Sequence, residues 1–227
     1  TVRDAGVTIA PETAVTALRK SSAGFELTTV RGTINAGQVA VCTNGYTGAV
    51  TQDLRRRVLP LRSAMIATAP LDPTLMKTLM PKARVYGDSR RLVAYYRPSP
   101  DGSRILFGGR GSGLADNSAA NFRILHRSMI AVYPQLSEVA TDHVWSGLVA
   151  YTFDHAPHIG RFQGGALDGA FYAMGYCGSG VARSSYFGSK LGLKMLGDPN
   201  GITAFDDLDF ETRPLYGGNP WFMPALL

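Results

Sequence analysis

The sequence lacks the features that mark several common classes of protein. Its 227 residues include two cysteines, Cys42 and Cys177, and four histidines. Because the cysteines are far apart, they make neither a disulfide framework nor a metal-ligand spacing. No apolar run is long enough to span a membrane, and the first residues do not form a signal peptide. We therefore expect no metal site and no membrane span, and a reducing cytoplasm as the location.

Acidic residues are fewer than basic ones. There are 23 Lys and Arg against 17 Asp and Glu, a formal net charge of +6. A nucleic-acid-binding surface would gather basic residues on one face with aromatic residues between them. Here the arginines are scattered, apart from a cluster at residues 55–57 and a pair at 90–91. This pattern is typical of a solvated surface, and we expect no nucleic-acid partner.

The motif G-x-G-x-x-G, which opens the first strand–helix unit of dinucleotide-binding proteins, is also absent. Another glycine-rich strand–helix junction is present. A short apolar strand at 170–175 leads into a turn with Gly175, Gly178 and Gly180, and a helix follows to about residue 196. Such glycines let a ligand approach the backbone, and a helix start offers unpaired N–H groups. The junction is typical of one half of a cofactor site.

The rest of the chain alternates strand and helix patterns. We expect helices at 73–80, 118–133 and 180–196, each with a recognisable start or stop signal. Gly188 and Gly192 are four apart, so we expect both on one helix face, packed closely on a sheet. The tail from residue 210 to 227 is expected to be an extended arm. Strand patterns cover residues 15–19, 25–29, 38–43, 58–67, 91–97, 104–108, 143–149, 157–162 and 170–175. Turn residues at 21–24 and 99–103 predict that the strands on either side of each form a hairpin.

Two stretches together carry a family resemblance. Residues 145–160 read W-x-G-x-x-x-x-T-x-D-x-x-P-x-I-G, and residues 175–180 read G-Y-x-G-x-G. In this order they resemble the carboxyl-terminal half of the FAD-dependent amine and amino-acid oxidoreductases, which include D-amino acid, glycine and sarcosine oxidases. Segments 59–62, 106–110 and 133–136 match the same family, and the tail is most similar to the gamma-glutamylputrescine oxidoreductase branch. The resemblance covers essentially the whole chain, starting from the family's middle.

The resemblance implies an α+β or α/β fold. It implies a substrate domain with a mixed, largely antiparallel sheet and flanking helices at 51–150. Residues 1–50 and 151–200 would form the remnant of a Rossmann-like FAD-binding domain without its N-terminal strand–helix unit. Residues 201–227 would be the extended arm.

The resemblance also implies a non-covalent FAD site. Val15, Thr43, Asn44 and Gly45 would line the adenine and pyrophosphate side, and Gly160 would let the flavin ring pass. The sarcosine oxidase position for covalent attachment holds Val149, which excludes a covalent flavin there. Without the missing motif, FAD binding to this chain alone is expected to be weak or absent. The flavin-pyrimidine contacts would fall on Gly175, Tyr176, Cys177, Gly178, Ser179, Gly180 and Val181.

The implied activity is oxidation of a C–N bond by hydride transfer from a neutral amine to FAD. In the amino-acid oxidases an Arg stands at the position of Val149 and pairs with the substrate carboxylate. Its absence favours an amine or an amino-acid-derived conjugate as substrate. Candidate substrate-binding residues are Tyr96, Arg97, Arg110 and Tyr151, although either arginine would serve equally in a local salt bridge.

No catalytic residue is assigned from the sequence. Cys177 has no His–carboxylate partner spaced to activate it as a nucleophile. We interpret His155 and His158 as residues of a surface loop, and Trp145 as a core residue of the substrate domain.

Two alternatives to an active single-chain enzyme stay open. The chain is a truncated, inactive fragment, or it is one subunit whose partner supplies the G-x-G-x-x-G half. A first residue other than Met favours a start inside a longer polypeptide, although processing would also remove Met.

Overall fold

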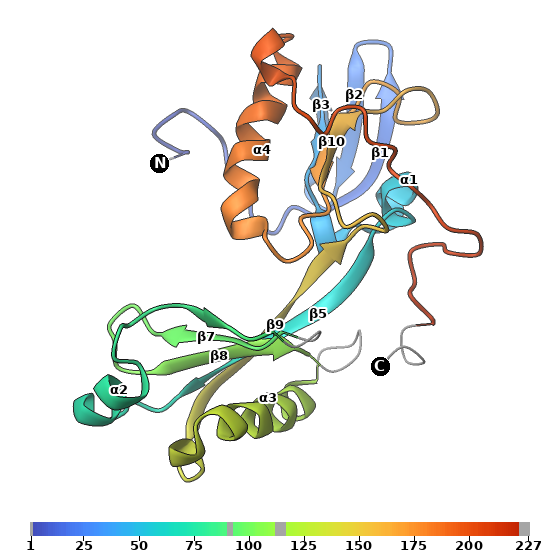
Figure 1. Cartoon of the computed structure of the whole chain (residues 1–227). Coiled ribbons are helices and arrows are strands. Elements are labelled where there is room, and N and C mark those ends of the chain that lie inside the picture. The colour runs from blue at the N-terminus through green and yellow to red at the C-terminus, as the bar shows by residue number, and fades with distance from the viewer. Residues whose placement is uncertain (1, 90–92, 112–116, 223–227) are drawn as a thin grey trace. The chain divides into compact units, whose positions relative to one another are not determined.

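The computed structural model describes residues 2–89, 93–111 and 117–222. The chain divides into two units. Unit 1 comprises Thr1–Leu59 and Ala150–Pro220, and unit 2 comprises Pro60–Val149 and Trp221–Leu227. The chain leaves unit 1 at the start of β5 (Leu59–Thr68) and returns at the end of β9 (Thr141–Tyr151) (Figure 1). The assignment of these parts to FAD and substrate binding remains a prediction.

The first sheet of unit 1 is an antiparallel meander. It contains β1 (Val15–Ser21), β2 (Gly24–Thr29) and β3 (Gly32–Ala36) in that order. Ser21 pairs with Gly24, so the hairpin expected between the first two strands is confirmed. The third strand was not predicted, because four of its five residues are exposed and it has no buried alternation.

The second sheet of unit 1 contains the only parallel pair that the described residues show. Its order is β10 (His158–Arg161), β11 (Phe171–Met174) and β4 (Ala40–Val41). Strands β10 and β11 are antiparallel, whereas β11 and β4 are parallel. The strand expected at 38–43 is therefore shorter than predicted. After Val41 the chain turns into the 3-10 helix η1 (Asn44–Tyr46), so it cannot extend the ladder.

Helix α4 (Gly180–Met195) packs on the second sheet through Phe187 and Leu191, which contact a cluster containing Ile159 and Phe171. The prediction that Gly188 and Gly192 pack closely on a sheet is wrong. Both are exposed, and a Cβ built on either would meet no atom within 4 Å. The buried stripe of the helix lies one residue before each glycine, which leaves the glycines on the other side.

Residues 210–220 of the tail run along unit 1 without helix or strand. Phe210 and Tyr216 are its buried anchors. The Tyr216 hydroxyl donates a hydrogen bond to the carbonyl of Val58 at 2.6 Å, and the Arg57 guanidinium donates to the carbonyl of Phe210. Short elements complete unit 1: η2 (Ala49–Thr51), α1 (Gln52–Arg55) and η4 (Pro199–Gly201). The expected arm also includes residues 223–227, which lie outside the described residues.

Unit 2 is a five-stranded antiparallel sheet with helices on one face (Figure 1). Its strand order is β6-β7-β8-β5-β9. The expected hairpin around residues 99–103 joins β7 to β8, although β7 begins later than predicted and Arg91 lies outside the described residues. The remaining bounds are β6 (Tyr86–Gly87), β7 (Tyr95–Pro98), β8 (Ile105–Arg110), α2 (Pro73–Leu79), α3 (Ser118–Val132) and η3 (Pro134–Leu136).

The helices of unit 2 begin where their sequences predict. The Asp72 carboxylate caps α2 by accepting hydrogen bonds from the N–H groups of Thr74 and Leu75. Met76 on α2, together with Leu125 and Met129 on α3, packs against Ile66 and Phe107 of the sheet. The α+β fold with mixed, largely antiparallel sheets and flanking helices is thus confirmed. No helix in the described residues has the length and apolar character to cross a membrane.

Phe107 tests this packing. It is 0 % exposed between the sheet and its helices. We expect Phe107→Ala to lower the free energy of unfolding by about 3–5 kcal/mol, because it removes a large buried ring and leaves a cavity. The control Val85→Ala, at a residue 72 % exposed, should change it by less than about 0.5 kcal/mol. Urea unfolding of both variants measures this, and equal effects would contradict the assigned core.

Candidate functional site

The candidate site lies where the carboxyl ends of β4 and β11 meet. Ala40 pairs with Phe171 and Val41 with Tyr172 in parallel, so the segments after both strands leave the same edge of the sheet. The Asn44 side-chain oxygen accepts a hydrogen bond from the N–H of Gly175 at 3.0 Å, across 131 positions of sequence. Sheets with parallel strands bind ligands at this edge. The structure therefore brings Asn44 to the Gly175–Gly180 turn.

The backbone around this edge is strained at several points. Asn44, His155 and Cys177 have positive φ angles of 46°, 60° and 50°, a region that non-glycine residues rarely occupy. Such conformations persist where neighbouring structure holds them, and they cluster at functional sites. The Cys177 N–H donates to the carbonyl of Ala150 at 3.0 Å, which fixes the turn on the end of β9.

The turn is also shaped by the loop that follows β9. Gly175 has φ +79°, and a Cβ there would lie 2.4 Å from Thr152 Cγ2. A Cβ on Gly178 would lie 3.4 Å from the Tyr151 hydroxyl. Tyr151, predicted to bind substrate, thus lies beside the turn predicted to bind the flavin. Gly175 is required here by both its conformation and its close contact.

The start of α4 is left without a cap. The Ser179 side chain makes no capping hydrogen bond and instead donates to the carbonyl of Tyr176 at 2.6 Å. The first turn has no acidic residue, and Val181 is 99 % exposed. The N–H groups of the first turn have no acceptor within a helix, and the helix dipole adds partial positive charge there. This helix start can therefore bind an electron-rich group.

A polar network that is buried at Thr152 and His158 and reaches the surface at Asp154 supports the loop between β9 and β10. The Asp154 carboxylate accepts hydrogen bonds from the Ala156 N–H at 3.1 Å and lies 3.1 Å from His158 Nε2. Thr152 Oγ1 donates to the carbonyl of Ala156 at 2.8 Å. Partial burial alone would raise the pKa of Asp154, but these hydrogen bonds outweigh it and hold the pKa below its usual range.

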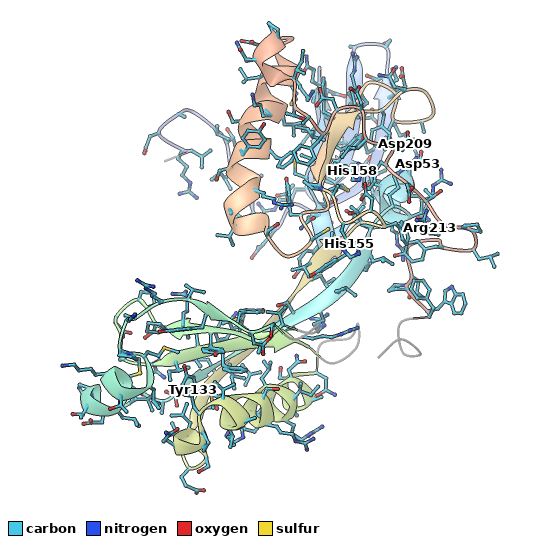
Figure 2. All side chains as sticks on the ribbon, viewed as in Figure 1. Asp53, Tyr133, His155, His158, Asp209 and Arg213 are labelled. Atoms are coloured by element: carbon cyan, nitrogen blue, oxygen red, sulfur yellow. The ribbon has the colours of Figure 1, made fainter. Side chains whose placement is uncertain are left out.

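The prediction that His155 and His158 share a surface loop is wrong for His158 (Figure 2). His158 is 1 % exposed and its ring stacks on Phe210 with centroids 4.1 Å apart. His155 is exposed, and its ring meets Tyr151 edge-on. The difference comes from the tail, since Phe210 covers one histidine and not the other.

Other predicted cofactor residues fall at varying places in unit 1. Val15 begins β1 in the first sheet, and no described contact joins it to the turn. A Cβ on Gly160 would lie 2.8 Å from the Tyr172 hydroxyl, so a packing contact already requires glycine there. Cys177 Sγ donates to the carbonyl of Gly175 at 3.2 Å. The other predicted cofactor residues follow β4 or β11 at the shared edge: Thr43, Gly45, Tyr176, Ser179 and Gly180.

The predicted substrate residues in unit 2 do not share one face of its sheet. The Tyr96 ring stacks between Tyr86 and Phe107 on the helix-covered face. Neighbouring Tyr133 meets Tyr96 edge-on, and burial, with the nearby Tyr96 and Tyr86, raises the pKa of Tyr133 to about 12. Arg97 is exposed and donates to the carbonyl of Pro98. Arg110 lies on the opposite face from Tyr96.

Trp145, predicted as a core residue, is 45 % exposed. Its neighbour Ser146 accepts a hydrogen bond from Arg62 on the helix-covered face, so alternation along β9 turns Trp145 to the other face. Both cysteines are free. Within the described ranges, no group of three or more His, Cys, Asp or Glu side chains is placed to hold a metal ion.

Comparison with known proteins identifies the family of the chain. Residues 1–191 match the family described as DAO, FAD dependent oxidoreductase. The chain is 30% identical over 219 residues to the probable oxidoreductase OrdL of Haemophilus influenzae, covering 95% of the chain and 48% of that protein. It is 29% identical over 197 residues to gamma-glutamylputrescine oxidoreductase of Escherichia coli, covering 86% and 45%. The glycine oxidase structure from Geobacillus kaustophilus aligns with a TM-score of 0.72 and 21% identity, covering 93% of the chain and 55% of that structure.

The family match defines the class as FAD-dependent oxidoreductases. This chain belongs to the family of FAD-dependent oxidoreductases that includes gamma-glutamylputrescine oxidoreductase and glycine oxidase. The chain spans about half the length of the curated relatives it matches.

The residues at the sheet edge fit the flavin end of FAD. The uncapped helix start suits its electron-rich pyrimidine. Sequence reasoning missed the supporting network of Thr152, Asp154 and His158. The spacing T-x-D-x-x-P contained it, but pointed to a family and not to these hydrogen bonds.

Two substitutions distinguish the steric requirement for glycine in the turn from the general effect of replacing a glycine inside a helix. We expect Gly175→Ala to lower the free energy of unfolding by at least about 1–2 kcal/mol, since a Cβ at positive φ is strained and meets Thr152. Gly188→Ala, inside α4 and free of contacts, should raise it by roughly 0.5–1 kcal/mol. Urea unfolding measures both, and a loss of stability in Gly188→Ala would show an unseen constraint on α4.

Asp154→Asn tests the network through its pH dependence. A lowered folded-state pKa gives stability that is present above the unfolded-state pKa and is lost as the pH falls through the folded-state value. We expect the variant to be less stable by about 1 kcal/mol near neutral pH. The gap should close between about pH 5 and about pH 3, as the native carboxylate protonates. The exposed control Asp209→Asn should match the native chain at neutral pH, and a pH-independent gap for Asp154→Asn would refute the network.

Proposed function

We propose that the chain forms the flavin-ring side of an FAD site and the substrate sheet of an enzyme that oxidises a C–N bond. The substrate would be an amine or an amino-acid-derived conjugate. The observation that carries the proposal is the uncapped start of α4 at the shared carboxyl edge of β4 and β11. Membership of an FAD-dependent oxidoreductase family supports it.

FAD, when bound, would supply the hydride acceptor for the oxidation. The chain's own part is to hold and orient that group. The N–H groups of Gly180, Val181 and Ala182 would donate to its pyrimidine edge, since no side chain caps them. Asn44 and Ala150 would keep those donors in place, because they bind the backbone of the turn at Gly175 and Cys177.

We infer that the nucleotide end of FAD is held by a polypeptide segment outside this sequence. The G-x-G-x-x-G fingerprint does not occur in it, and the relatives are about twice as long. One face of α4 supports the inference: Gly188 and Gly192 touch nothing, although glycine inside a helix costs stability. Val181 at the start of α4 is 99 % exposed, and Leu196, which directly follows the helix, is 82 % exposed. A segment packed on this face would explain these residues.

The substrate class rests on the relatives and on one position. The Escherichia coli relative is named for gamma-glutamylputrescine, an amine conjugate. Val149, where amino-acid oxidases of this family place an arginine, offers no cation to a simple α-amino acid. A conjugate whose acidic group lies away from the reacting amine suits the chain better.

Flavin content tests the proposal. We expect the purified 227-residue chain to be colourless, because it lacks the pyrophosphate anchor, and the product of the complete reading frame to be yellow and to oxidise amines. Absorbance in the visible region after gel filtration measures flavin retention. The products released by hydrolysis of the imine, formed only when an amine is added, measure activity.

Each outcome bears on a different part of the proposal. If the product of the complete reading frame retains flavin but oxidises no amine, the proposed reaction is contradicted. A 227-residue chain that retains flavin would contradict the need for a further segment. A reading frame that begins at Thr1, with flavin bound only after a second polypeptide is added, would identify a two-subunit enzyme.

A further inference from the structure

In the part of unit 2 that the structure describes, the sheet has one face without helices, here called the open face. Ile66 and Phe107 point to α2 and α3, so the alternate positions on the same strands lie on the open face. Ser63 pairs with Arg110, and Met65 pairs with Gly108, which pairs in turn with Tyr95. These five residues therefore share the open face across three neighbouring strands.

Gly108 lets the Tyr95 ring lie flat on this face. A Cβ on Gly108 would be 2.2 Å from Tyr95 Cε2 and 2.4 Å from Met65 Sδ. The Tyr95 hydroxyl then reaches Ser63 Oγ at 2.5 Å, beside the residue that pairs with Arg110. The Ser63 and Tyr95 hydroxyls thus meet beside the strand position of Arg110, and the packing of the Tyr95 ring requires glycine at position 108.

Arg110 is a partly dehydrated cation at that point. Its side chain is half-buried, and burial lowers the pKa of Arg110. Among the described residues no carboxylate is paired with it, and the strand positions of the open face carry no Asp or Glu. A guanidinium withdrawn from water gains most from an anion that binds it in the fork geometry of a carboxylate.

The two hydroxyls complete a site for such an anion. Ser63 and Tyr95 have two hydroxyl hydrogens, and their mutual bond uses one. The other hydrogen is available to a further acceptor. A carboxylate has two oxygens that accept several hydrogen bonds, so one group can take the guanidinium and the hydroxyl together.

We propose that Arg110, with Ser63 and Tyr95, binds a carboxylate of the substrate on the open face. This assignment rests on the proposed function, and it narrows the substrate to amines that also carry a carboxylate. Arg110 is then a specificity-determining residue, and Gly108 positions the Tyr95 hydroxyl for it.

The test uses the flavin-loaded product of the complete reading frame and two acylated diamines. They are identical except that one ends in a carboxylate and the other in a primary carboxamide. We expect kcat/KM to favour the carboxylate by about 10- to 100-fold, through KM. Arg110→Gln should abolish the preference, so that kcat/KM for the carboxylate falls to that for the carboxamide. Arg110→Lys should keep part of it, and Tyr95→Phe should weaken it a few-fold.

Arg127→Gln is the matched control, since Arg127 is an exposed arginine on α3. It should retain the full preference, and a circular dichroism melt checks that each variant is folded. Equal kcat/KM for the two substrates in the native enzyme would overturn the inference and leave the proposed function standing.

A second measurement needs no flavin chemistry. A calorimetric titration of the 227-residue chain with glutarate should show salt-sensitive binding. The Arg110→Gln variant should lose this binding, and the Arg127→Gln variant should keep it. If the enzyme oxidises no amine, the proposed function fails, and this titration alone decides the anion site. No binding of glutarate to the native chain would also refute it.

Discussion

The parallel pairing of β4 with β11 is the interaction on which the candidate flavin site depends. Strand β4 contributes only Ala40 and Val41, yet their register decides where the chain leaves the sheet after both strands. The hydrogen bond from Gly175 to Asn44 follows from that register, and the bond from Cys177 to Ala150 then ties the turn to β9. The direction of the α4 start is set by these few backbone contacts, because its own side chains do not cap it.

What the sequence predicts well has local causes. The α2 cap at Asp72, the hairpin at residues 99–103 and the strand–turn–helix at 170–196 each depend on residues close together in the chain. The rest depends on distant partners. His158 is buried because Phe210 covers it, and no spacing within the loop reports that contact. The pair Tyr95–Tyr96 gives no alternation, so only Phe107 across the strand shows which ring enters the core.

The site residues were predicted mainly through resemblance, and the structure adds the physical differences among them. Polar groups within the loop after β9 bind one another. The backbone carbonyl of Ala156 accepts a hydrogen bond from Thr152, its N–H donates one to Asp154, and His158 lies against Asp154. The first N–H groups of α4 have no such partner. A rigid, satisfied support beside unsatisfied donors is the arrangement expected of a preorganised binding site, because the donors need not reorganise when a ligand arrives.

The charge of the chain also has a local component. The net charge of +6 predicts only a solvated surface, but two positive groups lie at defined places in the structure. The α4 start carries the positive end of a helix dipole, and Arg110 is a half-buried cation on a face whose described strand positions lack carboxylates. Neither feature favours a protonated amine. Under the proposed function, each feature would bind an electron-rich group: the α4 start the pyrimidine of the flavin, and Arg110 a carboxylate of the substrate.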